Sequence, residues 1–184
     1  MDLSNLLLSI DSERLNLRAL RESDVTDSYV AWMNDREVNR FLESRFHDQT
    51  KEAVQAFVRD ALLSPNTLLF GIFAGPSGDH VGNIKVSEVS EAHLTAELGF
   101  IIGDRSVWGL GYATEAIFCV SEWAFSVLGL EKLTAGCYSE NIGSKKALEK
   151  SGFRQEAVLK NQVVNNSGKR IDSLRFAAHS QQVA

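Results

Sequence analysis

The 184-residue chain has few of the residues that build metal centres or covalent cross-links. It contains only two cysteines, Cys119 and Cys137, in segments predicted to be a helix and a strand. This arrangement offers neither a disulfide framework nor the ligand spacing of a zinc site. The four histidines are scattered singly, so we expect no metal ligands among them. The sequence therefore favours a cytoplasmic protein that works without a metal.

The chain also lacks an excess of basic residues and any long apolar run. Its 19 Lys and Arg residues are outnumbered by 24 Asp and Glu residues, for a formal charge of -5 at pH 7. Binding to nucleic acid through phosphates needs a broad basic surface, so we expect no nucleic-acid partner. No apolar run approaches the roughly 20 residues of a membrane helix. The start, MDLSNLLLSIDSER, has no basic residue ahead of its apolar run. We therefore expect no membrane partner and no secretion signal.

Proline is scarce too, and no repeat or low-complexity segment divides the chain. Pro65 and Pro76 both fall where turns are expected. A chain of this length with 44% hydrophobic residues can bury one core. We predict a leader over 1–12, one domain over 13–180 and a tail over 181–184.

The spacing of apolar residues predicts alternating strands and helices. Residues 13–20 alternate apolar and polar side chains, as a half-buried strand does, whereas residues 50–63 carry an apolar helical stripe behind Thr50. Further strands are predicted at 67–74, 80–89, 93–102, 132–138, 153–164 and 169–179, and further helices at 23–33, 36–42, 112–128 and 141–152. This order predicts an α/β (α+β) domain with a mixed sheet and helices on both faces.

Residues 103–116, GDRSVWGLGYATEA, place Gly109 and Gly111 between a predicted strand and a predicted helix. A helix N-terminus presents unpaired N–H groups, and glycine allows an anion to approach the main chain, so a phosphate or pyrophosphate is the expected ligand. A Walker A loop would need Lys and Ser/Thr after the second glycine. A dinucleotide fingerprint would need Gly or Ala at Thr114 and glycines directly after the strand. A plain strand-to-helix turn would also explain two glycines alone.

Three segments together resemble the GNAT acetyltransferase superfamily. AELGFIIGDRSVWGLGYATEA is similar to its central strand, loop and helix motif Q/R-x-x-G-x-G/A, with Ser106 in the place of Gln or Arg. YSENIGSKKALEKSGF resembles the N-x-x-S/A…E-K-x-G-F segment of the family. RLNLRAL, followed by WMNDREVNRFL, resembles the opening of the ribosomal-protein N-terminal acetyltransferase (Rim-type) branch. The resemblance extends from Arg14 to about Phe176.

This resemblance implies a GNAT fold, with a mixed and mostly antiparallel central sheet, and an acetyl-CoA-dependent N-acetyltransferase. Amides from Val107 to Ala113 would hold the pyrophosphate, and the main chain of residues 101–103 would pair with the pantetheine arm. Arg105 is either a phosphate clamp or a solvated loop arginine. Asn141 would contact the pantetheine and also cap the following helix. The expected cofactor-binding residues are Ile101, Ile102, Gly103, Arg105, Ser106, Val107, Trp108, Gly109, Leu110, Gly111, Tyr112, Ala113, Asn141 and Ser144.

Acetyl transfer to an amine calls for a base, an oxyanion donor and an acid for the departing thiolate. Strand alternation directs Glu97 away from the apolar face, and its place in AELGF matches the strand glutamate that is the base in histone-acetylating relatives. A glutamate paired with a neighbouring basic side chain is the alternative. Amides around Leu98 to Phe100 would serve the oxyanion.

The acid is less clearly marked. Many relatives have a tyrosine where this chain has Leu148, so no phenol is expected there. Ser144 could relay a proton to the thiolate, or it could be an ordinary helix-start serine. An acyl-enzyme on Cys137 is disfavoured because no histidine lies near it in the sequence.

The acceptor is the least defined part. The resemblance implies a primary amine on a protein N-terminus, an amino-sugar nucleotide or a small molecule, and it is compatible with a homodimer. Residues expected to border the acceptor are Trp32, Asn34, Arg40, Arg45 and Phe46. Arginines and aromatics could hold a nucleotide, or they could be a helix surface and its buried anchors. A non-catalytic module that senses acyl-CoA is the alternative function, because the tyrosine acid is absent.

Overall fold

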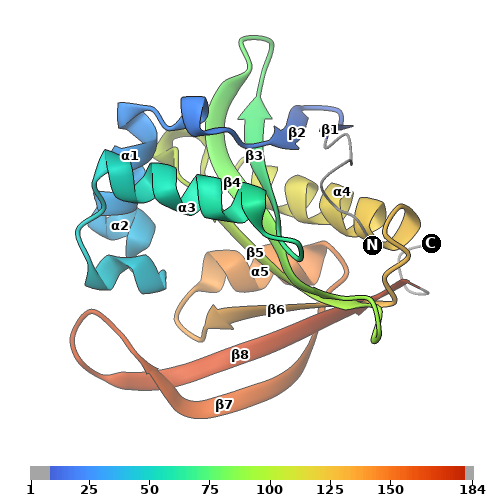
Figure 1. Ribbon diagram of the computed structural model, residues 1–184. Helices are drawn as coiled ribbons and strands as arrows, with labels where there is room; N and C mark the ends of the chain where they lie inside the picture. The colour runs from blue at the N-terminus through green and yellow to red at the C-terminus, as the bar shows by residue number, and fades with distance from the viewer. Residues whose placement is uncertain (1–8, 181–184) are drawn as a thin grey trace.

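A computed structural model describes residues 9–180, which form one eight-stranded sheet with helices on both faces (Figure 1). The strands are β1 (Ser9–Asp11), β2 (Leu15–Ala19), β3 (Leu68–Ala74), β4 (Asp79–Ser90), β5 (Thr95–Ile102), β6 (Lys132–Tyr138), β7 (Arg154–Val164) and β8 (Arg170–His179). The α-helices are α1 (Asp27–Asn34), α2 (Arg36–Asn39), α3 (Lys51–Leu63), α4 (Tyr112–Ser126) and α5 (Ile142–Lys150). Short 3₁₀ turns are η2 (Glu22–Asp24), η3 (Glu43–Phe46) and η4 (Arg105–Val107).

The strands follow the order β1-β2-β3-β4-β5-β6-β8-β7 across the sheet. Neighbouring strands are antiparallel except for β5 and β6, which run parallel because helix α4 crosses over between them. The sheet is therefore mixed and mostly antiparallel, as the sequence predicts.

Strand β3 is buried on both faces and divides the core in two. Phe70 and Ile72 face one cluster, in which the Phe70 ring meets Trp123 of α4 at 5.5 Å. Leu69 and Phe73 alternate with them and face the other cluster, to which α1 and α3 contribute. Helices α1 to α3 thus cover one face of the sheet, and α4 and α5 cover the other (Figure 1). This layering confirms the predicted fold class.

The element boundaries follow local capping. Thr26, Thr50 and Asn141 each accept a hydrogen bond from an amide in the first turn of α1, α3 and α5, so these helices begin directly after them. The predicted helix at 23–33 accordingly starts at Asp27, and the predicted helix at 36–42 ends at Asn39.

The ends of the chain differ in how they meet the predicted domain. Residues 9–11 of the predicted leader form β1, which pairs with β2 at the sheet edge. Residues 1–8 and the predicted tail, 181–184, lie outside the described residues. Between residues 9 and 180, the helices are all too short or too polar to cross a membrane.

Candidate functional site

The site begins where the two parallel strands separate. β5 and β6 pair only from Thr95 to Leu98 and from Lys132 to Ala135, and beyond that they diverge (Figure 1). Residues 99–102 of β5 still pair with β4 on one side. Their other edge is open, and Phe100, Ile101 and Ile102 line a cavity of about 470 Å³ that occupies the gap. An open strand edge offers main-chain N–H and C=O groups to an extended ligand.

The glycine loop connects this open edge to helix α4. Gly109 and Gly111 have φ values of 82° and 88°, which disfavour any residue with a side chain. Gly111 is the N-cap of α4 and provides no side-chain cap, so the first-turn amides of Tyr112, Ala113 and Thr114 have no intrahelical acceptor. All five residues line the first cavity. The loop can therefore donate several N–H groups to one anion.

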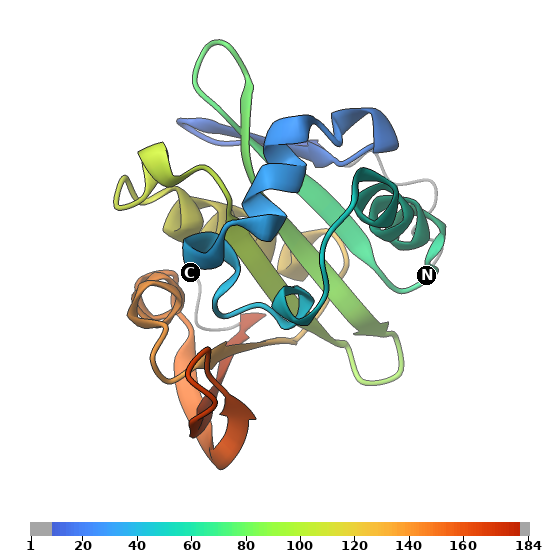
Figure 2. The ribbon, with the colours of Figure 1, turned by 90° about the vertical axis from the view of Figure 1, so that its left-hand side faces the viewer.

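The charge of the first cavity also favours an anion. Arg40, Lys146 and Lys150 line it, whereas Glu37 is the one carboxylate residue among its described lining residues. This local excess of positive charge is notable in a chain whose formal charge is -5. Figure 2 shows the segments that contribute: the α2 region, the glycine loop and α5 lie around one side of the molecule. The structure thus places Arg40, predicted to border the acceptor, beside the predicted cofactor residues.

Helix α5 begins at the cavity with the predicted Asn141 and Ser144. The Oδ1 atom of Asn141 accepts a hydrogen bond from the Ser144 amide at 3.1 Å, and both residues line the cavity. Leu148, which stands in the place of the tyrosine of many relatives, is fully buried in the core. A phenol is therefore absent here because this position packs against the apolar cluster rather than facing the cavity.

The predicted pantetheine partners are partly engaged already. The Ile102 carbonyl accepts a hydrogen bond from the indole N–H of Trp108 at 2.9 Å and keeps one lone pair. The Gly103 amide donates to the Val81 carbonyl at 2.9 Å. Trp32, predicted to border the acceptor, packs on Gly103 so closely that a Cβ there would lie 2.2 Å from the indole. Residue 103 is therefore glycine because it must accommodate this ring.

The polar side chains at the start of the loop bind to neighbouring residues. Arg105 is within 3.4 Å of Asp35 and lies over the Trp108 ring, and it is not among the residues that line the first cavity. The Ser106 amide and hydroxyl both donate to the Asp104 carboxylate, at 2.8 and 2.7 Å. These contacts hold the turn before the glycines in one conformation.

Glu97, the predicted base, forms an ion pair. Its Oε1 atom is 3.0 Å from Nη1 of Arg175 on β8, and its side chain is 29% exposed. It lies on the same face of β5 as Gly99 and Ile101, which line a second cavity. Glu97 itself is not among the described residues that line either cavity. Because alternate residues share one face of a strand, Glu97 is the neighbour of Gly99 on the face of β5 that lines the second cavity.

The second cavity, of about 330 Å³, lies against the opposite face of the open strand. It shares Leu42, Phe100 and Ile101 with the first cavity, so the two meet at the end of β5. Apolar side chains such as Met33 and Phe57 form much of its wall. Glu43 and Lys85 are its charged lining residues in the described part of the chain.

Two residues predicted to border the acceptor serve as structural links instead. The Asn34 side chain exchanges hydrogen bonds with the Gln49 main chain, at 2.8 Å to its carbonyl and 3.0 Å from its amide. Arg45 donates to the carbonyls of Leu42 and Val164, at 2.7 and 2.6 Å, and to the Tyr138 hydroxyl at 3.1 Å.

Tyr138 and Phe46 also belong to the contacts around Arg45. The Tyr138 hydroxyl also donates to the Glu43 carboxylate, which joins η3 to the end of β6. Phe46 is 59% exposed and lies under the Arg45 guanidinium. The arginine at position 45 therefore ties η3 to β6 and β7.

Cys137 lies on β6 just beyond the residues that pair with β5, but its thiol is a poor nucleophile. Burial raises the pKa of its thiol to about 11, with a smaller opposing effect of Lys145. The thiolate, rather than the thiol, is the reactive form. Within residues 9–180, no group of three or more His, Cys, Asp and Glu side chains could hold a metal ion.

Several lining residues were not predicted from the sequence. Lys146 and Lys150 are four residues apart on α5 and so point from one side of the helix into the first cavity. That spacing is visible in the sequence, but it is also common on solvated helix surfaces. Glu43 gave no signal because its role depends on how η3 folds over the end of β5.

Comparisons with known proteins agree with this geometry. The family model for the acetyltransferase (GNAT) domain matches residues 14–154, so the chain belongs to the GNAT acetyltransferase family and is an N-acetyltransferase of that family. It is similar to YoaA, an uncharacterized N-acetyltransferase of Bacillus subtilis (strain 168), with 28% identity over 159 residues, which cover 85% of this chain and 89% of YoaA.

Two solved structures share the fold over nearly the whole chain. One is a GNAT-family acetyltransferase from Bacillus anthracis, with a TM-score of 0.81 and 23% identity, covering 95% of this chain and 99% of that one. The other is spermidine N-acetyltransferase from Vibrio cholerae in complex with CoA and spermine, with a TM-score of 0.83 and 21% identity, covering 94% and 99%. The GNAT fold implies that this chain binds acetyl-CoA.

Proposed function

We propose that the protein transfers an acetyl group from acetyl-CoA directly to a primary amine while both are bound. The observation that carries this proposal is the meeting of two cavities at Phe100 and Ile101, on the open edge of β5. The first cavity is cationic and lined by the glycine loop, which suits a pyrophosphate ligand. The second is reached from the other face of the strand, which suits a separate acceptor.

The residues of the first cavity would divide the cofactor between them. The amides around Gly109 and Gly111 would donate to the pyrophosphate, with Lys146 and Lys150 as nearby cations. The main-chain groups that β5 directs toward its open edge would pair with the pantetheine arm, as an added strand does. Asn141, and with it Ser144, would lie beside the end of that arm. These assignments explain why the cavity extends from the loop to the start of α5.

The proton transfers are assigned to Glu97 and Ser144. Amines are mostly protonated at neutral pH, so a base is needed before attack on the thioester. Glu97 would accept this proton through a water, since it lies on the acceptor face of β5 beside Gly99. Ser144 lines the first cavity, and its hydroxyl would donate to the departing thiolate. The Phe100 region of the main chain would stabilise the oxyanion.

The acceptor favoured by the second cavity is an amine without phosphate groups. Arg45, which follows the lining residues Glu43 and Ser44, already donates to Leu42, Tyr138 and Val164. The cavity wall is largely apolar, and the Glu43 carboxylate can hold an ammonium group. A protein N-terminus or a small amine therefore fits better than an amino-sugar nucleotide. We also assign the protein to the Rim-type branch, because the opening segments RLNLRAL and WMNDREVNRFL resemble that branch.

A panel of acceptors tests this proposal. Release of CoA from acetyl-CoA is measured with peptides bearing free N-termini, with polyamines, and with UDP- and dTDP-amino sugars. We expect turnover with peptides or small amines and none with the nucleotides. Turnover confined to the amino-sugar nucleotides would overturn the acceptor assignment. CoA binding without turnover on any amine would favour the acyl-CoA sensor instead.

We also propose a cytoplasmic location, with which the two free cysteines, Cys119 and Cys137, agree.

A further inference from the structure

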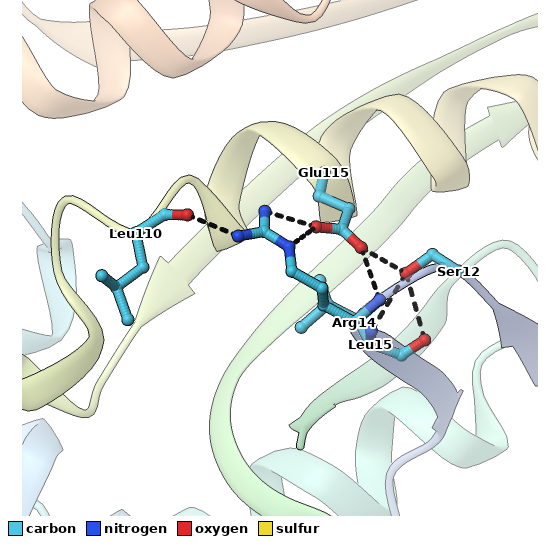
Figure 3. Close-up of polar contacts among 5 residues, drawn as sticks. All are labelled: Ser12, Arg14, Leu15, Leu110 and Glu115. Atoms are coloured by element: carbon cyan, nitrogen blue, oxygen red, sulfur yellow. Dashed lines mark hydrogen bonds and ion pairs between the residues drawn. The ribbon is translucent and has the colours of Figure 1, made fainter. Parts of the chain in front are cut away.

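Arg14 contacts the glycine loop from outside the first cavity (Figure 3). Its Nη1 atom donates to the Leu110 carbonyl at 2.8 Å. Its Nε and Nη2 atoms lie 2.7 and 2.5 Å from one oxygen of Glu115, in the first turn of α4. The same guanidinium lies 4.9 Å from the centre of the Tyr112 ring. One side chain thus contacts the last loop peptide and the start of the helix together.

The Glu115 carboxylate is held from both sides. Its other oxygen accepts from the Ser12 hydroxyl at 2.7 Å and from the Arg14 amide at 3.0 Å (Figure 3). Burial by itself would raise the pKa of Glu115, but the hydrogen bonds from Ser12 and Arg14 outweigh it and lower that pKa. The glutamate is therefore charged, fixed and only 16% exposed.

The bond to Leu110 sets the direction of the next amide. The Leu110 carbonyl and the Gly111 N–H belong to one planar trans peptide, so they point in opposite directions. Since Arg14, which does not line the cavity, holds the carbonyl on its own side, the Gly111 N–H is directed to the opposite side of the peptide, away from Arg14. With φ near 88°, Gly111 has no side chain to fix this peptide, and the carbonyl contact fixes it instead.

The ion pair removes an electrostatic conflict at the same place. A carboxylate in the first turn favours the helix, but it also repels any anion bound at that N-terminus. Arg14 cancels this charge at 2.5 Å, on the side of Glu115 next to the loop. The cavity therefore keeps the positive character that Lys146 and Lys150 give it.

We infer that Arg14 is a positioning residue for the pyrophosphate of the cofactor: it orients the Leu110–Gly111 peptide so that the Gly111 amide donates to a phosphate oxygen. The inference rests on the proposed function, because it takes CoA to be the ligand of the loop. Arg14 does not touch the cofactor in this arrangement. Its effect is limited to the phosphate end, because its side-chain contacts are all with the loop and the start of α4.

Binding of CoA is compared with binding of pantetheine, which lacks the pyrophosphate. Dissociation constants are measured by ¹⁵N NMR titration for the wild type, for Arg14→Met and for Arg18→Met. Arg18 is a matched control, since it pairs with Asp24 at 2.8 Å and has a similar exposure, yet it lies away from the loop. We expect Arg14→Met to weaken CoA binding about 10- to 100-fold, the effect of one charge-assisted hydrogen bond, and to leave pantetheine binding unchanged. The Gly111 amide resonance should respond to CoA only with Arg14 present.

Each outcome separates the inference from the proposed function. A wild type that binds CoA no better than pantetheine would contradict the phosphate role of the loop itself. A wild type that prefers CoA, with the same preference in Arg14→Met, would overturn the inference alone, as would equal weakening of both ligands. If Arg14→Met does not fold, Arg14→Lys is tested in its place. A lysine ammonium cannot bind both Glu115 and Leu110 in the geometry of the guanidinium fork, so this variant should also lose part of its preference for CoA. Full preference for CoA in that variant would also overturn the inference.

Discussion

Glu97, the proposed general base, forms an ion pair with Arg175. Glu97→Gln keeps the size of the side chain but removes its ability to accept a proton. We expect kcat to fall by about 10²–10⁴-fold, the usual contribution of a general base. The dissociation constant for CoA should stay the same, because Glu97 does not line the first cavity. Steady-state kinetics with the acceptor found by the panel provide the measurement.

Glu156→Gln is the matched control for this variant. Glu156 also lies within ion-pair distance of Lys132 and His179, but it is on β7, away from the open edge of β5. The kcat of Glu156→Gln should equal that of the wild type. If Glu97→Gln kept the wild-type kcat at neutral pH, another group would have to take the proton, and Glu97 would be a structural partner of Arg175.

Cys137 separates direct transfer from an acyl-enzyme route. With a pKa of about 11, its thiol is almost entirely protonated at neutral pH and cannot attack a thioester efficiently. We expect Cys137→Ala to keep kcat within about threefold of the wild type, since no step of direct transfer uses the thiol. Mass spectrometry of wild-type protein mixed with acetyl-CoA should show no acetyl group on Cys137. A trapped acetyl-Cys137, lost in step with activity in the variant, would reverse this conclusion.

At the scale of the elements, the glycine loop depends on main-chain conformation. Gly109 has a φ of 82° with open space around its Cα, so Gly109→Val introduces backbone strain and a side chain in the cavity. Gly129, at the other end of α4, has a φ of 66° and is equally open. Gly129→Val therefore introduces comparable strain without touching the cavity. We expect both to lower the melting temperature, but only Gly109→Val to abolish CoA binding in a calorimetric titration.

If Gly109→Val and Gly129→Val bound CoA equally well, the amides of the loop would not be the phosphate donors. If both lost binding in proportion to their loss of stability, the effect would be one of folding.

The elements themselves could largely be predicted, because apolar spacing records which face of each strand or helix is buried. The helix at Lys51–Leu63 and the hairpin of β7 and β8 follow the predicted pattern closely. β1 was missed because three residues carry no measurable period. The divergence of β5 from β6 is invisible in either strand, since it depends on how both pack against α4 and α5.

At the scale of the whole molecule, the sequence could suggest which residues matter but not their partners. The loop residues Gly109 and Gly111 and the cap Asn141 line the first cavity together because local main-chain geometry determines their place. Arg45 instead binds Tyr138 and Val164, about a hundred positions away, which no local pattern records. Long polar side chains reach partners that only the folded chain brings near, so their roles are the least predictable.

His80 gives the folded molecule a pH-dependent stability. It stacks on Phe73 and contacts Asn83 at 2.9 Å, in the aromatic cluster with Tyr29 and Trp32. Burial lowers the pKa of His80, and the hydrogen bond with Asn83 opposes this only in part. The unfolded chain, with a histidine pKa near 6.5, then binds a proton more readily than the folded protein. The stability from a neutral His80 is therefore complete above about pH 6.5 and is lost as the pH falls below it.

His80→Gln tests this origin of the pH dependence. The urea midpoint is measured near pH 7.5 and near pH 5.5, a range in which the carboxylates of lowered pKa stay charged. The variant is expected to be less stable than the wild type at the higher pH, because it loses the ring contacts with Phe73. It should lose less stability than the wild type between the two values, since it has no buried group to protonate. His47, His93 and His179 are common to both proteins, so their contributions cancel in this difference. An equal loss in both proteins would mean that the pH dependence arises at those other histidines rather than in the aromatic cluster.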